Sequence, residues 1–189
     1  MKKKILLLFA IIMVNVHAIE MRPIPWLTEG GIEFLEDYFK QHPDARVLEF
    51  GSGASTVWIA KRVKELHSVE HHGQWHESVV QAIEKDSLSD HVFCYLREKP
   101  YYGICEEFEN ESFDLILVDG RNRKGCVAHA LPKLKKGGLL VLDDAEREFY
   151  FPVYTLMENW ETCGYIQTKP DSCGFYYHGK ETRWWKKPE

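Results

Sequence analysis

The chain has 189 residues, 44% of them hydrophobic and 28% charged, which is typical of one globular domain that buries a core. This length leaves little room for a second domain. The formal net charge of −5 gives no reason to expect a nucleic-acid partner, because such proteins usually carry an excess of basic residues. None of the five cysteines forms a CxxC pair, which argues against a zinc site.

The first eighteen residues have the pattern of a targeting segment. Lys2, Lys3 and Lys4 precede an apolar run over 5–14, and small or apolar residues around Ala18 occupy the usual cleavage positions. The run is shorter than the ~20 residues of a membrane span. We therefore expect a signal peptide over 1–18 and an exported protein. The alternative is an uncleaved membrane anchor with a domain that faces the cytoplasm. Residues 19–189 form the single remaining domain.

Helical and strand patterns alternate along that domain. Apolar residues recur every three or four positions in four segments, which predicts helices over 28–39, 55–64, 74–85 and 127–134, the last ended by Gly137-Gly138. Runs of β-favouring residues predict strands over 46–50, 66–69, 91–96, 113–118 and 139–142. Near the C-terminus, a Lys-Pro-Asp-Ser turn between 165–168 and 175–178 predicts a β-hairpin.

Five strands that alternate with helices predict a three-layer α/β/α sandwich with a mostly parallel, Rossmann-like sheet. The C-terminal hairpin would add an antiparallel strand, which ordinary dinucleotide-binding folds lack. In an oxidising compartment this hairpin would bring Cys163 and Cys173 together for a disulfide, and free buried cysteines are the alternative.

The stretch over 46–56 is the most informative part of the chain. A short apolar strand runs into Gly51 and Gly53, which permit a tight turn and close approach of a ligand to the backbone. Ser55 or Thr56 then caps a helix. Open α/β sheets bind nucleotides at a unit of this kind, in which a strand, a glycine turn and a helix follow one another.

Acidic residues stand at the carboxyl ends of four of the five strands, where such sheets bind ligands. They are Glu49, Glu70, Asp119 and the pair Asp143-Asp144. Carboxylates beside apolar strands are costly unless they are paired or bind a ligand, so the set indicates a functional site. Glu70 lies nineteen residues after Gly51, which suits an acid that accepts both ribose hydroxyls, and a solvated strand-end acid is the alternative.

The glycine turn argues against NAD, because Thr56 stands where the third glycine of the GxGxxG fingerprint is expected. Glu49, two residues before the first glycine, suits a ligand with a cationic amino-acid end.

These motifs resemble those of class I S-adenosylmethionine-dependent methyltransferases over residues 32–178. Leu48-Glu49-Phe50-Gly51-Ser52-Gly53 is similar to their motif I, Val69-Glu70 to their second strand end, and 114–120 and 137–142 to their fourth and fifth strands. The resemblance implies a cofactor site with Gly51, Ser52 and Gly53 against the methionine part, Glu49 holding that end, Glu70 on the ribose and Asp119 on the same rim. One histidine ring just past Glu70, His71, would contact ribose or adenine.

Asp119, Asp143 and Asp144 also resemble the acids of small divalent-metal-dependent O-methyltransferases. That likeness implies that the three aspartates bind Mg²⁺, which would orient an acceptor hydroxyl and lower its pKa. The sequence departs from the pattern because Asp144 replaces an asparagine and Asn122 replaces a lysine. Asp119 and Arg121 are the candidate catalytic residues. The alternative is that the acids cap helices or lie near substrate without a metal.

The resemblance therefore implies an S-adenosylmethionine-dependent transferase that methylates an oxygen of a small molecule or glycan, with no nucleic-acid acceptor. Two other classes stay open: a non-catalytic nucleoside-binding or extracytoplasmic interaction protein, and a nicotinamide-dependent oxidoreductase, which the missing glycine disfavours. Export conflicts with a cofactor made in the cytoplasm, unless the chain is anchored facing the cytoplasm or enters a compartment that imports the cofactor.

Overall fold

The computed structural model describes residues 24–174 and 178–189. The expected signal peptide or anchor over 1–18 lies outside these ranges. Within them, no helix is both long enough and apolar enough to span a membrane. All five cysteines are described and free, including Cys163 and Cys173, which are both exposed, so the disulfide considered above is not formed.

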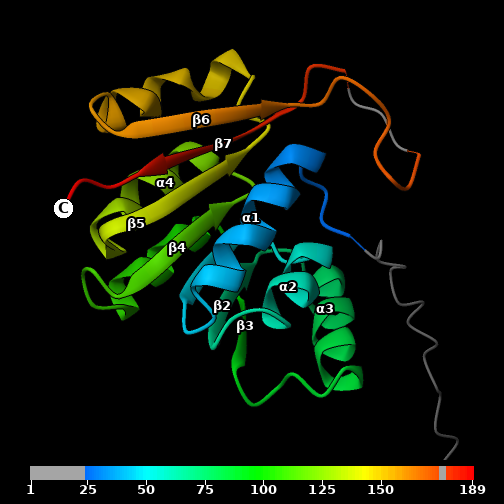
Figure 1. The fold of residues 1–189 in the computed structure, drawn as a ribbon. Coiled ribbons are helices and arrows are strands. Elements are labelled where there is room, and N and C mark those ends of the chain that lie inside the picture. The colour runs from blue at the N-terminus through cyan, green and yellow to red at the C-terminus, as the bar shows by residue number, and fades with distance from the viewer. Residues whose placement is uncertain (1–23, 175–177) are drawn as a thin grey trace, which may run out of the picture.

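The centre of the molecule is a seven-stranded sheet in the order β3-β2-β1-β4-β5-β7-β6 (Figure 1). Five neighbouring strands are parallel and β7 is antiparallel to both β5 and β6. The strands are β1 (Arg46–Phe50), β2 (Glu65–Glu70), β3 (Val92–Leu96), β4 (Phe113–Val118), β5 (Leu134–Asp143), β6 (Glu161–Ile166) and β7 (Glu181–Lys186).

Helices cover both faces of the sheet, so the predicted three-layer sandwich is confirmed. One face packs against α1 (Glu29–Gln41), α2 (Ala54–Ala60) and α3 (Gly73–Lys85). The other face packs against α4 (Arg123–Ala130) and three 3₁₀ segments, η1 (Tyr101–Glu107), η2 (Leu131–Lys133) and η3 (Glu148–Met157). Figure 1 shows α1 to α3 on the side of the sheet opposite α4.

The apolar strands divide the core into two halves, because successive side chains of a strand point to opposite faces. In β4, Ile116 and Val118 belong to the half under α4, whereas Leu115 and Leu117 belong to the half under α1 to α3. All four are fully buried. This two-sided burial explains why β4 reads as a continuous apolar run.

The hairpin is present, but its strands lie farther apart in the sequence than predicted. β6 ends at Ile166 and β7 begins only at Glu181, whereas 175–177 lie outside the described residues. The prediction missed β7 because the charged residues Arg183 and Lys186 interrupt its β-favouring residues. Burial of Trp185 against the core, with only 3% of its surface exposed, places that segment between β5 and β6.

β5 is also longer than predicted. It begins at Leu134 and passes through Gly137 and Gly138, which were expected to end a helix. The pairing with β4 is irregular there, since Phe113 pairs with Leu134 but Leu115 pairs with Leu139. Gly137 has a φ of +71°, so the glycine supports an irregularity within the strand rather than a helix end.

Candidate active site

The turn after β1 packs backbone against backbone on the loop after β4. Gly51 has a φ of +98°, and a Cβ atom built there would lie 2.5 Å from the Gly120 nitrogen. The Gly120 N–H donates to the Phe50 carbonyl at 2.7 Å, as does the Asp119 N–H at 2.9 Å. Glycine is required at Gly51 for this close approach of protein backbone, in addition to any approach of a ligand.

Glu49 lies beneath that turn with no exposed surface. Its Oε1 accepts from the Ser55 hydroxyl at 2.5 Å, and its Oε2 accepts from the hydroxyls of Thr56 at 2.6 Å and Ser68 at 2.5 Å. Burial raises the pKa of the Glu49 carboxyl to about 7, although the three hydroxyls oppose the shift. The geometry makes Glu49 a residue that holds the turn to the start of α2.

Glu70 is 4% exposed at the end of β2, and within the described part of the chain its hydrogen bonds come from backbone N–H groups. Its Oε1 accepts from the N–H groups of His71 and His72, each at 2.8 Å, and its Oε2 from the Ser52 N–H at 3.2 Å. The His71 Nδ1 lies 2.9 Å from the same Oε1. The carboxylate is therefore fixed beside the glycine turn, and no Lys or Arg pairs with it within the described residues.

Two tryptophans adjoin the turn. The Trp75 indole N–H donates to the Ser52 carbonyl, and a Cβ at Gly53 would lie 3.5 Å from that nitrogen. Trp26 is half exposed and its ring centroid lies 6.3 Å from that of Trp75. His72 caps α3 by accepting from the Trp75 N–H.

The three aspartates lie at the carboxyl ends of β4 and β5. Asp119 and Asp144 both contact the Arg123 Nη2, at 2.9 Å and 3.0 Å, and Asp143 lies 2.7 Å from the Lys180 Nζ. The Arg147 Nη2 contacts the same Asp144 oxygen, Oδ2, at 2.7 Å. The structure thus brings the three predicted acids together, but among three basic side chains.

This arrangement does not support the predicted magnesium site at Asp119, Asp143 and Asp144. Among the residues that the structure describes, no group of three or more His, Cys, Asp or Glu side chains is placed to hold a metal ion. The physical reason is that Arg123 and Lys180 supply the positive charge these carboxylates need. A divalent ion would have to displace those cations to reach the carboxylate oxygens.

The electrostatics of this cluster follow from burial. Burial, and next the charge of neighbouring Asp143, raises the pKa of Asp119 well above its ordinary value. Burial also raises the pKa of Asp143, although Lys180 opposes that shift. For Lys180, burial alone would lower the pKa, but the charge and hydrogen bond of Asp143 together with the charges of Asp119 and Asp144 outweigh burial and raise it. Lys180 is therefore charged at neutral pH and cannot serve as a proton acceptor there.

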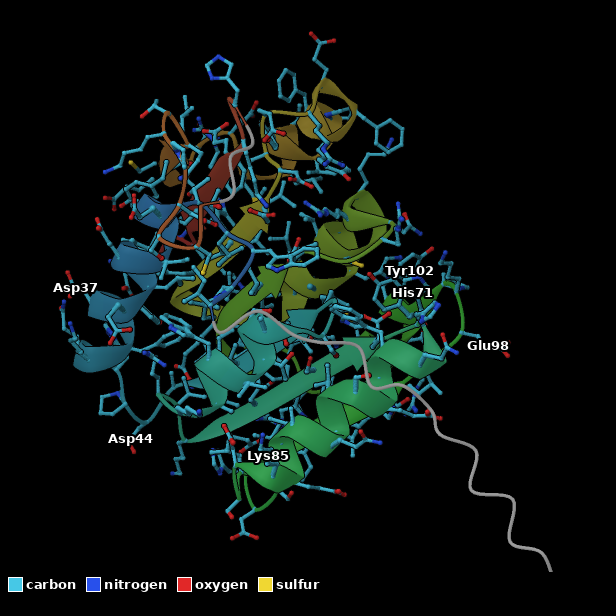
Figure 2. All side chains as sticks on the ribbon, turned by 90° about the vertical axis from the view of Figure 1, so that its right-hand side faces the viewer. Asp37, Asp44, His71, Lys85, Glu98 and Tyr102 are labelled. Carbon is cyan, nitrogen blue, oxygen red and sulfur yellow. The ribbon has the colours of Figure 1, made fainter. Side chains whose placement is uncertain are left out.

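Arg121 points to solvent, and its carbonyl accepts from the buried Tyr101 hydroxyl at 2.6 Å. The His71 ring lies 5.4 Å from the Tyr101 ring, so the loops after β2, β3 and β4 meet here. Figure 2 shows His71, Tyr102 and Glu98 on one side of the molecule, opposite Asp37 and Asp44. All the predicted site residues lie along the carboxyl edge of the sheet.

A glycine turn after β1, an acid at the end of β2 and a 3-2-1-4-5-7-6 sheet define a Rossmann-like methyltransferase fold. A family model described as a methyltransferase domain matches residues 48–145, just over half of the chain. The chain belongs to this methyltransferase-domain family.

Solved structures share the fold at low sequence identity. An O-methyltransferase from Bacillus cereus in complex with SAH has a TM-score of 0.69 and 18% identity, over 84% of this chain and 80% of that chain. An rRNA methylase from Streptococcus thermophilus has a TM-score of 0.64 and 12% identity, over 84% of this chain and 97% of that chain. A tRNA (m1A58) methyltransferase from Aquifex aeolicus has a TM-score of 0.61 and 17% identity, over 83% of this chain and 68% of that chain. A search of curated proteins gave no match.

Sequence reasoning missed the partners that hold the site together. Thr56 was one of two residues predicted to cap a helix and Ser68 lies in the predicted strand over 66–69, but neither was expected to bond to Glu49. Lys180 gave no signal, since it lies 36 positions after Asp144 and only the path of β7 brings it back.

Proposed function

We propose that this chain binds S-adenosylmethionine along the rim formed by Ser52, Gly53, Glu70 and His71, and transfers its methyl group to an oxygen of a small molecule or glycan. The observation that carries the proposal is the Glu70 carboxylate, held by three backbone N–H groups beside the glycine turn. A fixed carboxylate with remaining lone pairs is suited to accept hydrogen bonds from two ribose hydroxyls.

Each residue has a defined part in this proposal. Glu70 orients the ribose, and Ser52 and Gly53 present backbone to the methionine part. Glu49 acts through Ser55 and Thr56, which it ties to the turn, because both of its oxygens already accept from hydroxyls. The cofactor supplies an activated methyl group for transfer to a nucleophile.

The choice of an oxygen acceptor rests on the fold shared with O-methyltransferases and on the acids at the ends of β4 and β5. Asp119 and Arg121 stand at the loop where an acceptor would meet the methyl group, with Asp119 tied to Arg123 at 2.9 Å and the Arg121 side chain free to reach solvent. Neighbours of the same fold are named as rRNA and tRNA methylases, so the test below must include nucleic acid as an acceptor.

Calorimetric titration of the full chain with S-adenosylhomocysteine tests cofactor binding. We expect one site per chain, and Glu70→Gln should weaken binding by roughly 10- to 100-fold, since a hydrogen bond to a charged group is worth about 1.5–3 kcal/mol. Glu77→Gln, at an exposed position on α3, is the matched control and should bind as the wild type does. A wild-type chain that binds neither S-adenosylhomocysteine nor S-adenosylmethionine would refute the proposal. Binding of NAD instead would favour an oxidoreductase.

The acceptor is tested with S-adenosylmethionine that carries a labelled methyl group, incubated with small-molecule, glycan and RNA fractions. We expect label in the first two fractions, bonded to oxygen. Label on RNA or on nitrogen would overturn the oxygen acceptor but leave the cofactor assignment in place. Cofactor binding without transfer to any fraction would favour the non-catalytic nucleoside-binding alternative.

We also propose that the chain is exported through residues 1–18. The basis is the sequence pattern of three lysines, an apolar run and a small-residue site at Ala18. N-terminal sequencing of the mature protein should begin at Ile19. Retention of Met1 would instead favour the membrane anchor.

A further inference from the structure

Lys180 reaches the aspartate pair from a distant part of the chain. It lies just before β7, and its Nζ is 2.7 Å from the Asp143 Oδ2 and 3.6 Å from the Asp144 Oδ1. The same ammonium donates to the Trp26 carbonyl. Its side chain is only 14% exposed. Three oxygen atoms from two separate segments therefore surround one nearly buried positive charge.

The other oxygens of the aspartate pair are also occupied. The Thr182 hydroxyl donates to the Asp143 Oδ1 at 2.8 Å. The Asp144 Oδ2 contacts the Arg123 Nη2 at 3.0 Å and the Arg147 Nη2 at 2.7 Å. Every carboxylate oxygen of the pair thus has either a hydrogen-bond partner or an ion-pair partner in the protein.

The charges of the cluster balance as well. Asp119, Asp143 and Asp144 face three basic side chains, Arg123, Arg147 and Lys180. The guanidinium of Arg123 is fixed further, because its Nε donates to the Gly120 carbonyl at 2.9 Å and its Nη1 to the Asp143 carbonyl. It cannot swing away without leaving two backbone carbonyls unpaired.

A divalent ion would face two obstacles here. Mg²⁺ requires oxygen ligands at about 2.0–2.1 Å in near-octahedral geometry and loses its water reluctantly. It would also be repelled by three positive charges within a few ångströms. Of the three cations, Lys180 is the one whose nitrogen contacts the carboxylates of both Asp143 and Asp144, as a bound metal ion would.

We propose that Lys180 is the resident cation of this aspartate pair, so that the native chain binds no divalent ion there and holds Asp143 and Asp144 in place without one. Assignment of this rim to the methyl acceptor rests on the proposed function. The cation assignment rests on the contacts alone and is tested apart from methyl transfer.

The test is a Mn²⁺ titration of the full-length protein, followed by electron paramagnetic resonance of the free ion. We expect no site in the wild type at ~1 mM Mn²⁺. Lys180→Ala should bind Mn²⁺ ~100-fold more tightly than the wild type, because one positive charge leaves the immediate neighbourhood of the ion. Lys180→Ala combined with Asp143→Asn should lose that gain. Lys180→Arg, which restores the charge, should again exclude the ion.

Lys61→Ala is the matched control, since Lys61 pairs with Asp86 at 2.6 Å on the surface. It should leave Mn²⁺ binding unchanged. If Lys180→Ala does not fold, Lys180→Gln keeps most of the side chain and the hydrogen-bond donors while it removes the charge.

Two results would overturn the proposal: a wild-type Mn²⁺ site that Asp143→Asn abolishes, or folded Lys180→Ala and Lys180→Gln variants that gain no binding. Failure of the wild type to bind S-adenosylhomocysteine would bear on the proposed function and not on this assignment.

Discussion

Glu49 shows how burial changes the chemistry of one residue. A carboxyl with no exposed surface and no cationic partner among its contacts is easier to bury protonated than ionised. Its three hydroxyl partners come from the start of α2 and from β2, so the side chain joins two elements under the glycine turn. The consequence is a pH-dependent contribution to stability.

We predict that Glu49 lowers stability as the pH rises from 4.5 to 7. In this window the unfolded chain has released the Glu49 proton, whereas the folded chain still holds it, since its pKa is about 7. The shift corresponds to roughly 3 kcal/mol. Urea unfolding of the wild type and of Glu49→Gln at both pH values measures it. Relative to Glu49→Gln, the free energy of unfolding of the wild type should fall by that amount between pH 4.5 and pH 7. A difference that stays constant would contradict the prediction.

Gly51 gives a second prediction at this scale. Gly51→Ala places a Cβ 2.5 Å from the Gly120 nitrogen at a φ of +98°. Backbone strain of 1–3 kcal/mol and the overlap together should cost about 3 kcal/mol, which lowers Tm by roughly 6–12 °C. Gly73→Ala is the control, because nothing lies within 4 Å of a Cβ there. Equal Tm values for the two variants would show that the backbone contact does not constrain Gly51.

At the level of helices and strands, the residue that precedes α1 is hydrogen-bonded to β7 and, through it, to the end of β5. The Thr28 N–H donates to the Thr182 hydroxyl at 2.9 Å, and that hydroxyl donates to Asp143 at 2.8 Å. One threonine on β7 therefore links the helix cap of α1 to the end of β5. Both threonines are almost fully buried, so neither bond has water as a substitute partner.

We expect Thr182→Val to destabilise the protein by about 1–3 kcal/mol, because the shape is kept while a buried N–H and a buried carboxylate each lose a partner. Chemical unfolding measures the change. Thr155→Val is the control, since the Thr155 hydroxyl bonds to the Pro152 carbonyl at an exposed position. A loss at Thr182 no greater than at Thr155 would show that the link is not needed.

Over the whole molecule, stability should decrease from the centre of the sheet toward its two edges. β1 and β4 are paired on both sides and almost fully buried, whereas β6 is an outer strand with mostly exposed side chains. We predict that hydrogen exchange is slowest in β1 and β4 and much faster in β6, because edge amides open without global unfolding. Amides of β6 that exchange as slowly as those of β4 would contradict this.

The residue pattern was enough to predict a mostly parallel sheet and to locate its first five strands along the chain. β1 and β4 are short apolar runs that end at a glycine turn or an acid, and the physical cause of that pattern, burial on both faces, is local to each strand. The same locality made Glu49, Ser52, Gly53 and Glu70 readable, since they lie on or directly after a strand. The missed β7 differs because its charged side chains hide a strand that only its neighbours bury.

The groups that neutralise the acids became evident from the three-dimensional fold alone. From the sequence, Asp119, Asp143 and Asp144 at two strand ends are consistent with a metal site and with acids that cap helices or lie near substrate without a metal. Lys180 becomes their partner because the chain returns through β6 before it enters β7, which places its ammonium 2.7 Å from Asp143. A basic residue from a distant segment leaves no local pattern in the sequence. The fold is therefore needed to tell whether a metal ion or a lysine neutralises these acids.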